Sequence, residues 1–483
     1  MGSRRSRTPL SEILNKAKLA VLLLFVASRV PIALTEPPGS TMAGVNVLYG
    51  YEVERAAALG LSFYELHARN RQDADPSGSP TERLVEYPPL TILWMAMPTW
   101  FLDPIAKTGM VPDRQVEAAK QANRFAMLAV DLCGFALLLL TGASAVRLGV
   151  YAAGGLLLFP VLYERSDLLL GFLALAAVML LLRRLPVWAP LGMLALAVNL
   201  KVTPLVLAPL FVLGTLPAEA MSSASRIARR AAFLALLTAA IFAPFLARDG
   251  LVTLDFLRYH VARGLQIESV WSTMPVLLAA LFRIPSGTPI RFGAVELDSA
   301  LAGVLRTLST IATVALIPVL SVVLWKKIVG QPEPSATRIP DPPLPQAQAN
   351  PSLFSRYALV FLLTAIAVAP VFSPQYLLWV LPLVAMWDGR RPCLVWAGFF
   401  VICALTSWCY PFNYTALLLV TQAGKGFSAG YRLLGAAPLV ARNLLLVGLT
   451  VVCWRDTASA APAGSIAPDA TPAVPAARRT RAR

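Results

Sequence analysis

The sequence predicts an all-α polytopic membrane protein, a multi-helix bundle of about 12 transmembrane helices. The first observation behind this prediction is composition. Of 483 residues, 57% are hydrophobic and only 14% are charged, which is too little charge to cover a soluble chain of this length. The second is that apolar runs approaching the roughly 20 residues of a membrane span recur along the chain. They cover residues 20–34, 125–140, 168–182, 231–246, 307–325, 358–371, 393–408 and 436–454.

The basic residues indicate which helix ends face the cytoplasm. In a membrane protein, a formal net charge of +16 follows from the excess of Lys and Arg in cytoplasmic loops, so no nucleic-acid partner is expected. Basic groups collect at Arg183 and Arg184, at Arg226, Arg229 and Arg230, at Lys326 and Lys327, and at Arg390 and Arg391. We therefore expect an integral, multi-pass plasma membrane protein whose first apolar run is retained as a helix.

The same reasoning divides the chain into segments. A basic cytoplasmic N-terminus (1–18) precedes a membrane domain (19–455), and a disordered cytoplasmic tail (456–483) follows. Within the membrane domain, residues 36–86 and 248–299 form large extracytoplasmic loops, and the Pro-rich segment 328–355 is a cytoplasmic linker. Apolar residues at helical spacing over 47–66 predict an amphipathic helix on the membrane surface. The short apolar stretches 88–103 and 274–284 are expected to be interfacial or re-entrant, because full crossings would place several basic pairs outside.

One polar stretch interrupts this apolar pattern in the second extracytoplasmic loop. Between residues 259 and 269 the sequence places His260, Arg263, Gln266 and Glu268 between two hydrophobic segments. Polar groups at membrane depth are costly unless they line a cavity or an interface, so the stretch is a candidate functional site. The alternative is an interfacial loop whose charges face water.

Other ionisable groups fall on the same predicted face. Glu52, Glu86 and Asp167 are candidate bases, and Arg165 and Lys201 are candidate anion-binding cations. Cations that hold an anionic ligand beside a carboxylate that accepts a proton are the parts needed to transfer a sugar from a lipid phosphate. Structural alternatives are also open: both Glu86 and Asp167 precede helices, where a negative charge is favourable, and Lys201 suits a membrane interface.

Metal and nucleotide chemistry are not expected. The chain has only two histidines, and neither a Walker A nor a GxGxxG pattern is found. We therefore predict no metal ligands and no cofactor.

Five motifs, in order over roughly residues 20–390, resemble the bacterial GT-C membrane glycosyltransferases. The closest resemblance is to glycosyltransferase family 87, the polyprenyl-phosphate-mannose-dependent α-mannosyltransferases typified by actinobacterial enzymes. The motifs are Glu86-Tyr87-Pro88-Pro89-Leu90, Glu164-Arg165-Ser166-Asp167-Leu168-Leu169, Asn199-Leu200-Lys201-Val202-Thr203-Pro204, Arg263-Gly264-Leu265-Gln266-Ile267-Glu268-Ser269, and Ser373-Pro374-Gln375-Tyr376-Leu377-Leu378-Trp379.

The resemblance implies inverting, metal-independent transfer of a hexose, mannose in the family, at the outer face of the membrane. The donor would be a polyprenyl-phosphate sugar, and the acceptor a glycolipid or polysaccharide of the cell envelope. On this basis the expected catalytic carboxylates are Glu52, Glu86 and Asp167. The expected substrate-binding residues are Tyr87, Arg165, Lys201, His260, Arg263, Gln266, Glu268 and Gln375.

The chain departs from the family at the usual base. The family places an aspartate shortly after the first helix, and the matching position here holds Asn46, whose amide is not a useful base. Glu52 or Glu54 nearby, Glu86, or Asp167 would have to serve instead. Two other functions therefore stay open: a transporter or flippase of lipid-linked sugars, and a non-catalytic family member that binds envelope lipids.

Overall fold

The computed structural model describes residues 15–37, 42–72, 84–101, 113–329, 345–422 and 427–459. Most of the predicted cytoplasmic N-terminus, Pro-rich linker and tail lies outside these residues. The side chain of Asn46 also lies outside what the structure describes. The predictions made for these parts are therefore not tested.

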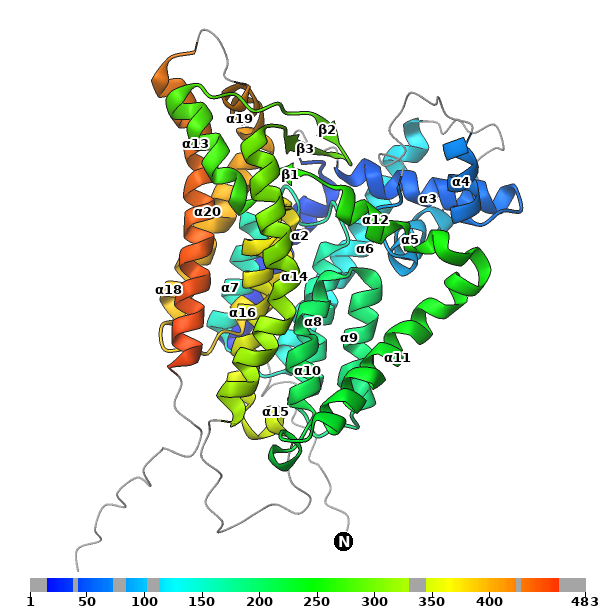
Figure 1. Ribbon diagram of the computed structural model, residues 1–483, viewed down its shortest axis with the longest axis vertical. Coiled ribbons are helices and arrows are strands. Elements are labelled where there is room, and N and C mark those ends of the chain that lie inside the picture. Colours follow the sequence, from blue (N-terminus) through cyan, green and yellow to red (C-terminus); the bar gives the residue numbers. More distant parts are fainter. Residues whose placement is uncertain are drawn as a thin grey trace, which may run out of the picture.

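The described residues form an upright bundle of helices (Figure 1). Among them, seven helices are long and apolar enough to cross a membrane. Their outward faces expose leucine and valine, for example Leu24 at 70% and Val314 at 73%, as expected for helices that contact lipid. The seven are α2 (Lys16–Leu34), α6 (Asp113–Leu140), α11 (Ala224–Asp249, continued by η5, Gly250–Leu254, and α12, Asp255–Ala262), α14 (Ala300–Val329), α16 (Pro351–Val368), α18 (Pro392–Ser407) and α20 (Ala429–Ala458). The chain is thus an α-helical membrane protein.

Six further apolar helices have only 10–17 residues. A helix of 13 residues, such as α7 or α9, is about 20 Å long, whereas the hydrocarbon core of a bilayer is about 30 Å thick. The predicted count of about 12 spans is therefore not confirmed. The shorter helices are α7 (Ala145–Leu157), α8 (Asp167–Leu181), α9 (Trp188–Leu200), η3 (Thr203–Leu207) with α10 (Ala208–Gly214), η6 (Val270–Ser272) with α13 (Thr273–Phe282), and η7 (Pro374–Tyr376) with α17 (Leu377–Ala385).

Several short helices form the centre of the bundle. All nine residues of α17 are buried, and α8 packs against both α17 and α9. At Gly171 of α8 an added Cβ would lie 2.3 Å from the backbone oxygen of Leu378, so α8 and α17 approach each other backbone to backbone. The upper ends of α8 and α9 lie below those of α14 and α20 (Figure 1). The polar turns before α8 and after α9 therefore lie deeper in the bundle than the upper ends of the long helices.

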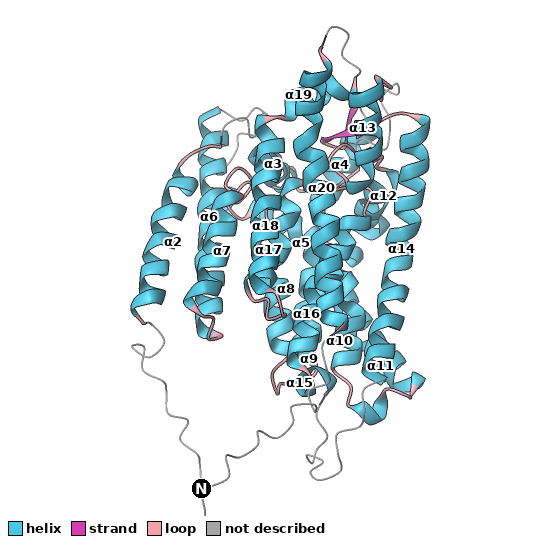
Figure 2. Cartoon of the chain, turned by 90° about the vertical axis from the view of Figure 1, so that its left-hand side faces the viewer, coloured by secondary structure: helices cyan, strands magenta, loops and turns pink. Residues whose placement is uncertain are grey.

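One end of the bundle carries a cap of short elements (Figure 1; Figure 2). It contains a three-stranded antiparallel sheet of order β1-β3-β2. The predicted basic pairs follow α8, end α14 and precede α18, at the opposite end of the bundle. The cap consists of α3 (Met42–Ala58), α4 (Phe63–Gln72), α5 (Pro89–Ala96), η2 (Thr99–Phe101), α12, β1 (Leu265–Gln266), β2 (Ile290–Arg291), β3 (Ala294–Leu297) and α19 (Tyr414–Thr421). The remaining elements are η4 (Ala218–Ala220), α15 (Gln346–Ala349) and the π-helix η8 (Trp408–Phe412).

The amphipathic helix expected over 47–66 is two helices, α3 and α4. Gly60 has a φ of +69°, a left-handed conformation that ends α3. Ser62 then begins α4 with a capping box: its hydroxyl accepts from Glu65 N at 3.0 Å, and Glu65 Oε2 accepts from Ser62 N at 2.6 Å. The prediction of a single helix over 47–66 was wrong. Apolar periodicity alone does not show that one helix ends at Gly60 and that the next begins at Ser62. In the stretches 88–103 and 274–284, α5 and α13 have 8 and 10 residues, so each is too short to span alone.

Candidate functional site

The candidate site includes the turn that precedes α8. Side chains of α6 hold this turn in place. Arg124 Nε donates to Glu164 Oε1 at 3.0 Å, and Asn123 Nδ2 donates to the backbone oxygen of Tyr163 at 3.1 Å. The Tyr163 hydroxyl donates to Asp131 Oδ2 at 2.7 Å. Three side chains of one long helix therefore fix the backbone that leads into Arg165 and Asp167.

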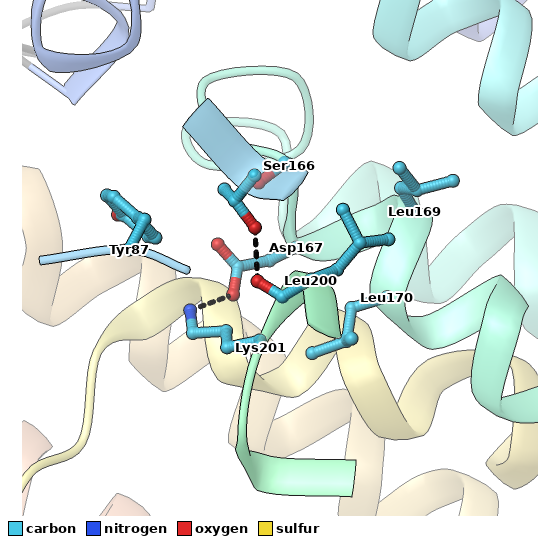
Figure 3. Close-up of a pocket in the computed structure, with 8 residues that line it drawn as sticks. Tyr87, Ser166, Asp167, Leu169, Leu170, Leu200 and Lys201 are labelled. Carbon is cyan, nitrogen blue, oxygen red and sulfur yellow. Dashed lines mark hydrogen bonds and ion pairs between the residues drawn. The ribbon is translucent and has the colours of Figure 1, made fainter. Parts of the chain in front are cut away.

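Asp167 and Lys201 form an ion pair inside the bundle (Figure 3). Lys201 Nζ lies 2.7 Å from Asp167 Oδ1, and Trp379 Nε1 donates to the same oxygen at 2.6 Å. The ammonium also lies 4.9 Å from the ring centroids of Tyr376 and Trp379, within the range of cation–π attraction. Asp167 is 2% exposed and its Oδ1 accepts two donors, so its carboxylate compensates the charge of Lys201 inside the bundle.

Glu86 is the more accessible carboxylate. Its side chain is 21% exposed, and its Oε2 lies 3.9 Å from Arg165 Nη1. Arg165 also donates to the Tyr87 hydroxyl. Glu86 thus lies beside a buried cation and is itself partly accessible, as expected of a base that must reach a ligand.

The segment after α12 supplies a second buried cation. Arg263 is 5% exposed, its Cζ lies 5.4 Å from the ring centroid of Tyr259, and its Nε has no hydrogen-bond partner. Glu86 is close enough to interact electrostatically with Arg263 and with His260, whose side chain is exposed. The cap and the bundle therefore place two buried arginines and one accessible carboxylate at a single location.

Glu52 approaches this location from α3. Both Glu52 and Glu86 interact electrostatically with the Tyr49 hydroxyl, which accepts from Glu86 N at 3.3 Å. Burial raises the pKa of Glu52 above its ordinary value, although nearby Arg55 opposes the shift. Glu52 is therefore less readily ionised than an ordinary glutamate.

A small cavity lies beside Tyr87, Asp167 and Lys201 (Figure 3). Its volume is about 10 Å³, which is enough for about one water molecule. Thr91 of α5 donates to the backbone oxygen of Leu200 and so closes one side. The cavity is therefore too small for a ligand much larger than water. The lining residues are Tyr87, Thr91, Ser166, Asp167, Leu169, Leu170, Leu200 and Lys201.

Two of the predicted substrate-binding residues belong to a different cluster. Gln266 Nε2 donates to Glu268 Oε2 at 3.1 Å, and the charged neighbour of Glu268 is Arg442 of α20. β1 ends at Gln266, and residues 267 and 268 form a turn directly after it. That Gln266 and Glu268 bind substrate stays a prediction. Gln375 is 4% exposed and its Oε1 has no hydrogen-bond partner.

The sequence reasoning did not single out Arg442, Asn443 or the buried ion pair of Asp131. Arg442 and Asn443 are buried near the middle of α20, within the predicted apolar run 436–454. An arginine inside a membrane helix is itself a signal of function or of a specific partner. Asp131 pairs with Arg29 of α2 at 3.0 Å.

Neither a family model nor a curated protein matches this chain. The resemblance to glycosyltransferase family 87 therefore depends on the five motifs. Each motif contributes a residue to the location just described, although the motifs are spread over nearly 300 residues. These residues are Glu86 and Tyr87, Arg165 and Asp167, Lys201, Arg263, and Tyr376 and Trp379.

The buried position of Glu268 predicts a pH-dependent stability. Burial raises its pKa from the ordinary value of 4.5 to about 7, against the opposing effect of Arg442. Between these two values the folded protein holds a proton that the unfolded chain releases, so this group's contribution is complete below pH 4.5 and is lost as pH rises through 7.

We expect the wild-type midpoint of thermal unfolding in detergent to fall between pH 5 and pH 8 by more than that of Glu268→Gln. Differential scanning fluorimetry of both proteins across this range measures the difference. Parallel curves would show that Glu268 does not titrate in this interval.

Proposed function

We propose that this protein is a membrane glycosyltransferase. It transfers a hexose, mannose by the family resemblance, from a polyprenyl-phosphate sugar to a glycolipid or polysaccharide of the cell envelope. The observation that carries the proposal is the accessible carboxylate of Glu86 beside the buried cations Arg165 and Arg263. Together they provide a proton acceptor and a binding place for a phosphate.

The reaction assigns a role to each group. Glu86 accepts the proton of the acceptor hydroxyl, whose oxygen forms a bond to the anomeric carbon of the sugar. The bond from that carbon to the phosphate oxygen breaks, and its electron pair leaves with the polyprenyl phosphate. Arg165 and Arg263 stabilise the charge that develops on this leaving group, with Lys201 beneath them. One displacement of this kind inverts the anomeric configuration.

The arrangement in the membrane supports a lipid-linked donor. The basic helix ends lie opposite to the site, which by the positive-inside rule supports a site at the extracytoplasmic face of the plasma membrane. An apolar groove of about 400 Å³ opens between α11 and α14, with α10 behind it; it lies toward the end of the bundle opposite to the site, next to Arg226 and Lys326, and so is separate from the proposed phosphate-binding place. Its lining residues are Ala208, Pro209, Val212, Leu213, Ile227, Ala231, Ile317, Ser321, Val322 and Trp325.

The proposal is tested by sugar transfer in lipid nanodiscs, with radiolabelled polyprenyl-phosphate mannose and a range of envelope acceptors. We expect transfer by the wild type and weakened donor binding by Arg263→Ala. Arg258→Ala is the matched control, because Arg258 lies on α12 with its side chain 79% exposed. Saturable donor binding with no transfer to any acceptor would overturn the proposal in favour of a carrier or a lipid-binding protein.

A further inference from the structure

Arg442 and Asn443 of α20 bind the backbone of the segment that carries Arg263. Arg442 is 0% exposed and its Nη2 donates to the backbone oxygen of Glu268. Asn443 is 1% exposed, and its Nδ2 donates to the Ser269 oxygen and to Thr273 Oγ1, each at 2.9 Å. The two side chains also bond to each other, from Arg442 Nε to Asn443 Oδ1 at 3.0 Å. A residue pair in one membrane helix thus fixes the backbone at 268 and 269.

Arg442 also contacts a second segment of the site. Its Cζ lies 4.2 Å from the ring centroid of Phe372, which precedes η7 and its Tyr376. The two segments are joined directly, because Gln266 N donates to the backbone oxygen of Pro370 at 3.0 Å. One guanidinium therefore contacts both the 263–269 segment and the 369–376 segment.

These two segments deliver side chains to the site that have few bonds of their own. Arg263 Nε has no hydrogen-bond partner, so the direction of this arginine depends on its backbone. That backbone is held at Gly264, whose N donates to Glu296 Oε1 at 2.7 Å. An added Cβ at Gly264 would lie 2.5 Å from the same carboxylate, so a larger residue there would displace the Glu296 side chain. Tyr376 in turn lies against Lys201.

We propose that the Arg442–Asn443 pair positions the candidate site. It holds the 263–269 and 369–376 segments in register, so that Arg263 and Tyr376 face Glu86 and Lys201. Neither residue of the pair touches the substrate. The expected effect of the pair on donor binding rests on the proposed function. Its expected effect on the positions of the two segments does not.

The alternative is that Arg442 only packs α20 into the bundle, and α20 provides a matched control for it. Arg432 is 4% exposed, and it donates to the backbone oxygens of Ala280 at 3.0 Å and Phe427 at 2.8 Å. It is therefore a buried arginine of the same helix that bonds to backbone carbonyls outside both site segments. Arg432→Met carries a similar loss of bonding without affecting residues 263–269.

The first test is hydrogen–deuterium exchange of the purified protein in nanodiscs, which needs no substrate. We expect the amides of residues 264–272 to exchange at least tenfold faster in Arg442→Met than in wild type, with Arg442→Lys in between. Arg432→Met should leave them unchanged. If Arg442→Met does not fold, Asn443→Ala, which keeps the arginine, should still accelerate exchange at 269–273. Unchanged exchange in the folded Arg442 or Asn443 variants would overturn the proposal.

The second test is a double-mutant cycle on affinity for polyprenyl-phosphate mannose. We expect Arg442→Met to weaken donor binding about as much as Arg263→Ala does, and the double variant to be no weaker than Arg263→Ala alone, because Arg442 acts through Arg263. Additive losses would overturn the positioning role. If the wild type binds no donor, the proposed function fails, and the exchange experiment still decides the role of the pair.

Discussion

Glu86→Gln is expected to reduce sugar transfer by about 10²–10⁴-fold while donor affinity stays within about twofold. Glutamine has the shape of glutamate and still accepts a hydrogen bond, but its amide does not accept a proton near neutral pH. Glu86 is the candidate whose side chain is 21% exposed, against 2% for Asp167, so it has the better access to an acceptor hydroxyl. The single change therefore removes proton transfer and leaves the phosphate-binding cations in place.

The other two carboxylates should respond differently. Asp167→Asn removes the charge that compensates Lys201, so we expect it to weaken folding and donor binding as well as turnover. Glu52→Gln should have a smaller effect, because burial already raises the pKa of Glu52 and favours its neutral form.

Single-turnover transfer of radiolabelled polyprenyl-phosphate mannose, together with equilibrium donor binding, separates these outcomes. Glu65→Gln is the control, because Glu65 is an exposed carboxylate of the cap and glutamine can retain its capping role. Full activity of Glu86→Gln beside an inactive Glu52→Gln or Asp167→Asn would move the base to that residue.

The sequence predicted the fold class better than the number of spans. Apolar composition alone identifies membrane helices, and the run 168–182 lies within one residue of α8. Apolar composition does not show where a helix turns back inside the protein. The polar turn at Lys201 is stable there because Asp167, Tyr376 and Trp379, from other parts of the chain, surround its charge. Such tertiary partners permit a short helix that a hydropathy profile treats as a full span.

The same limit applies to the candidate site. Motif residues such as Glu86 and Arg165 were found because their types suit the chemistry. The position of Glu268 beside Gln266 and Arg442 depends on the turn at residues 267 and 268 and on α20, neither of which the local sequence pattern shows. Arg442 was missed because the run 436–454 was assigned from its overall hydrophobicity. A single buried cation in such a run nevertheless requires a polar partner elsewhere in the protein.

Asp131→Leu is expected to destabilise the folded protein by about 3–5 kcal/mol, the usual effect of removing one partner of a buried ion pair. Arg29 Nε lies 3.0 Å from Asp131 Oδ2, and both side chains are 0% exposed. The hydroxyls of Tyr151 and Tyr163 donate to the same carboxylate. The substitution therefore leaves a buried cation and two hydroxyls without their acceptor, while leucine keeps a similar volume.

Equilibrium unfolding in mixed micelles measures this loss, and Arg29→Met/Asp131→Leu tests its cause. Removing both charges should recover a large part of the stability, because the buried cation is then absent as well. Glu117→Gln is the control: Glu117 pairs with Lys120 on the same helix with its side chain 57% exposed, so its loss should change stability by less than about 1 kcal/mol. A double variant no more stable than Asp131→Leu would show that the two tyrosines, and not Arg29, depend on this carboxylate. Tyr163 directly precedes the turn that carries Arg165 and Asp167. That result would therefore mean that Asp131 stabilises this turn through Tyr163, and that compensating the charge of Arg29 is not its main role.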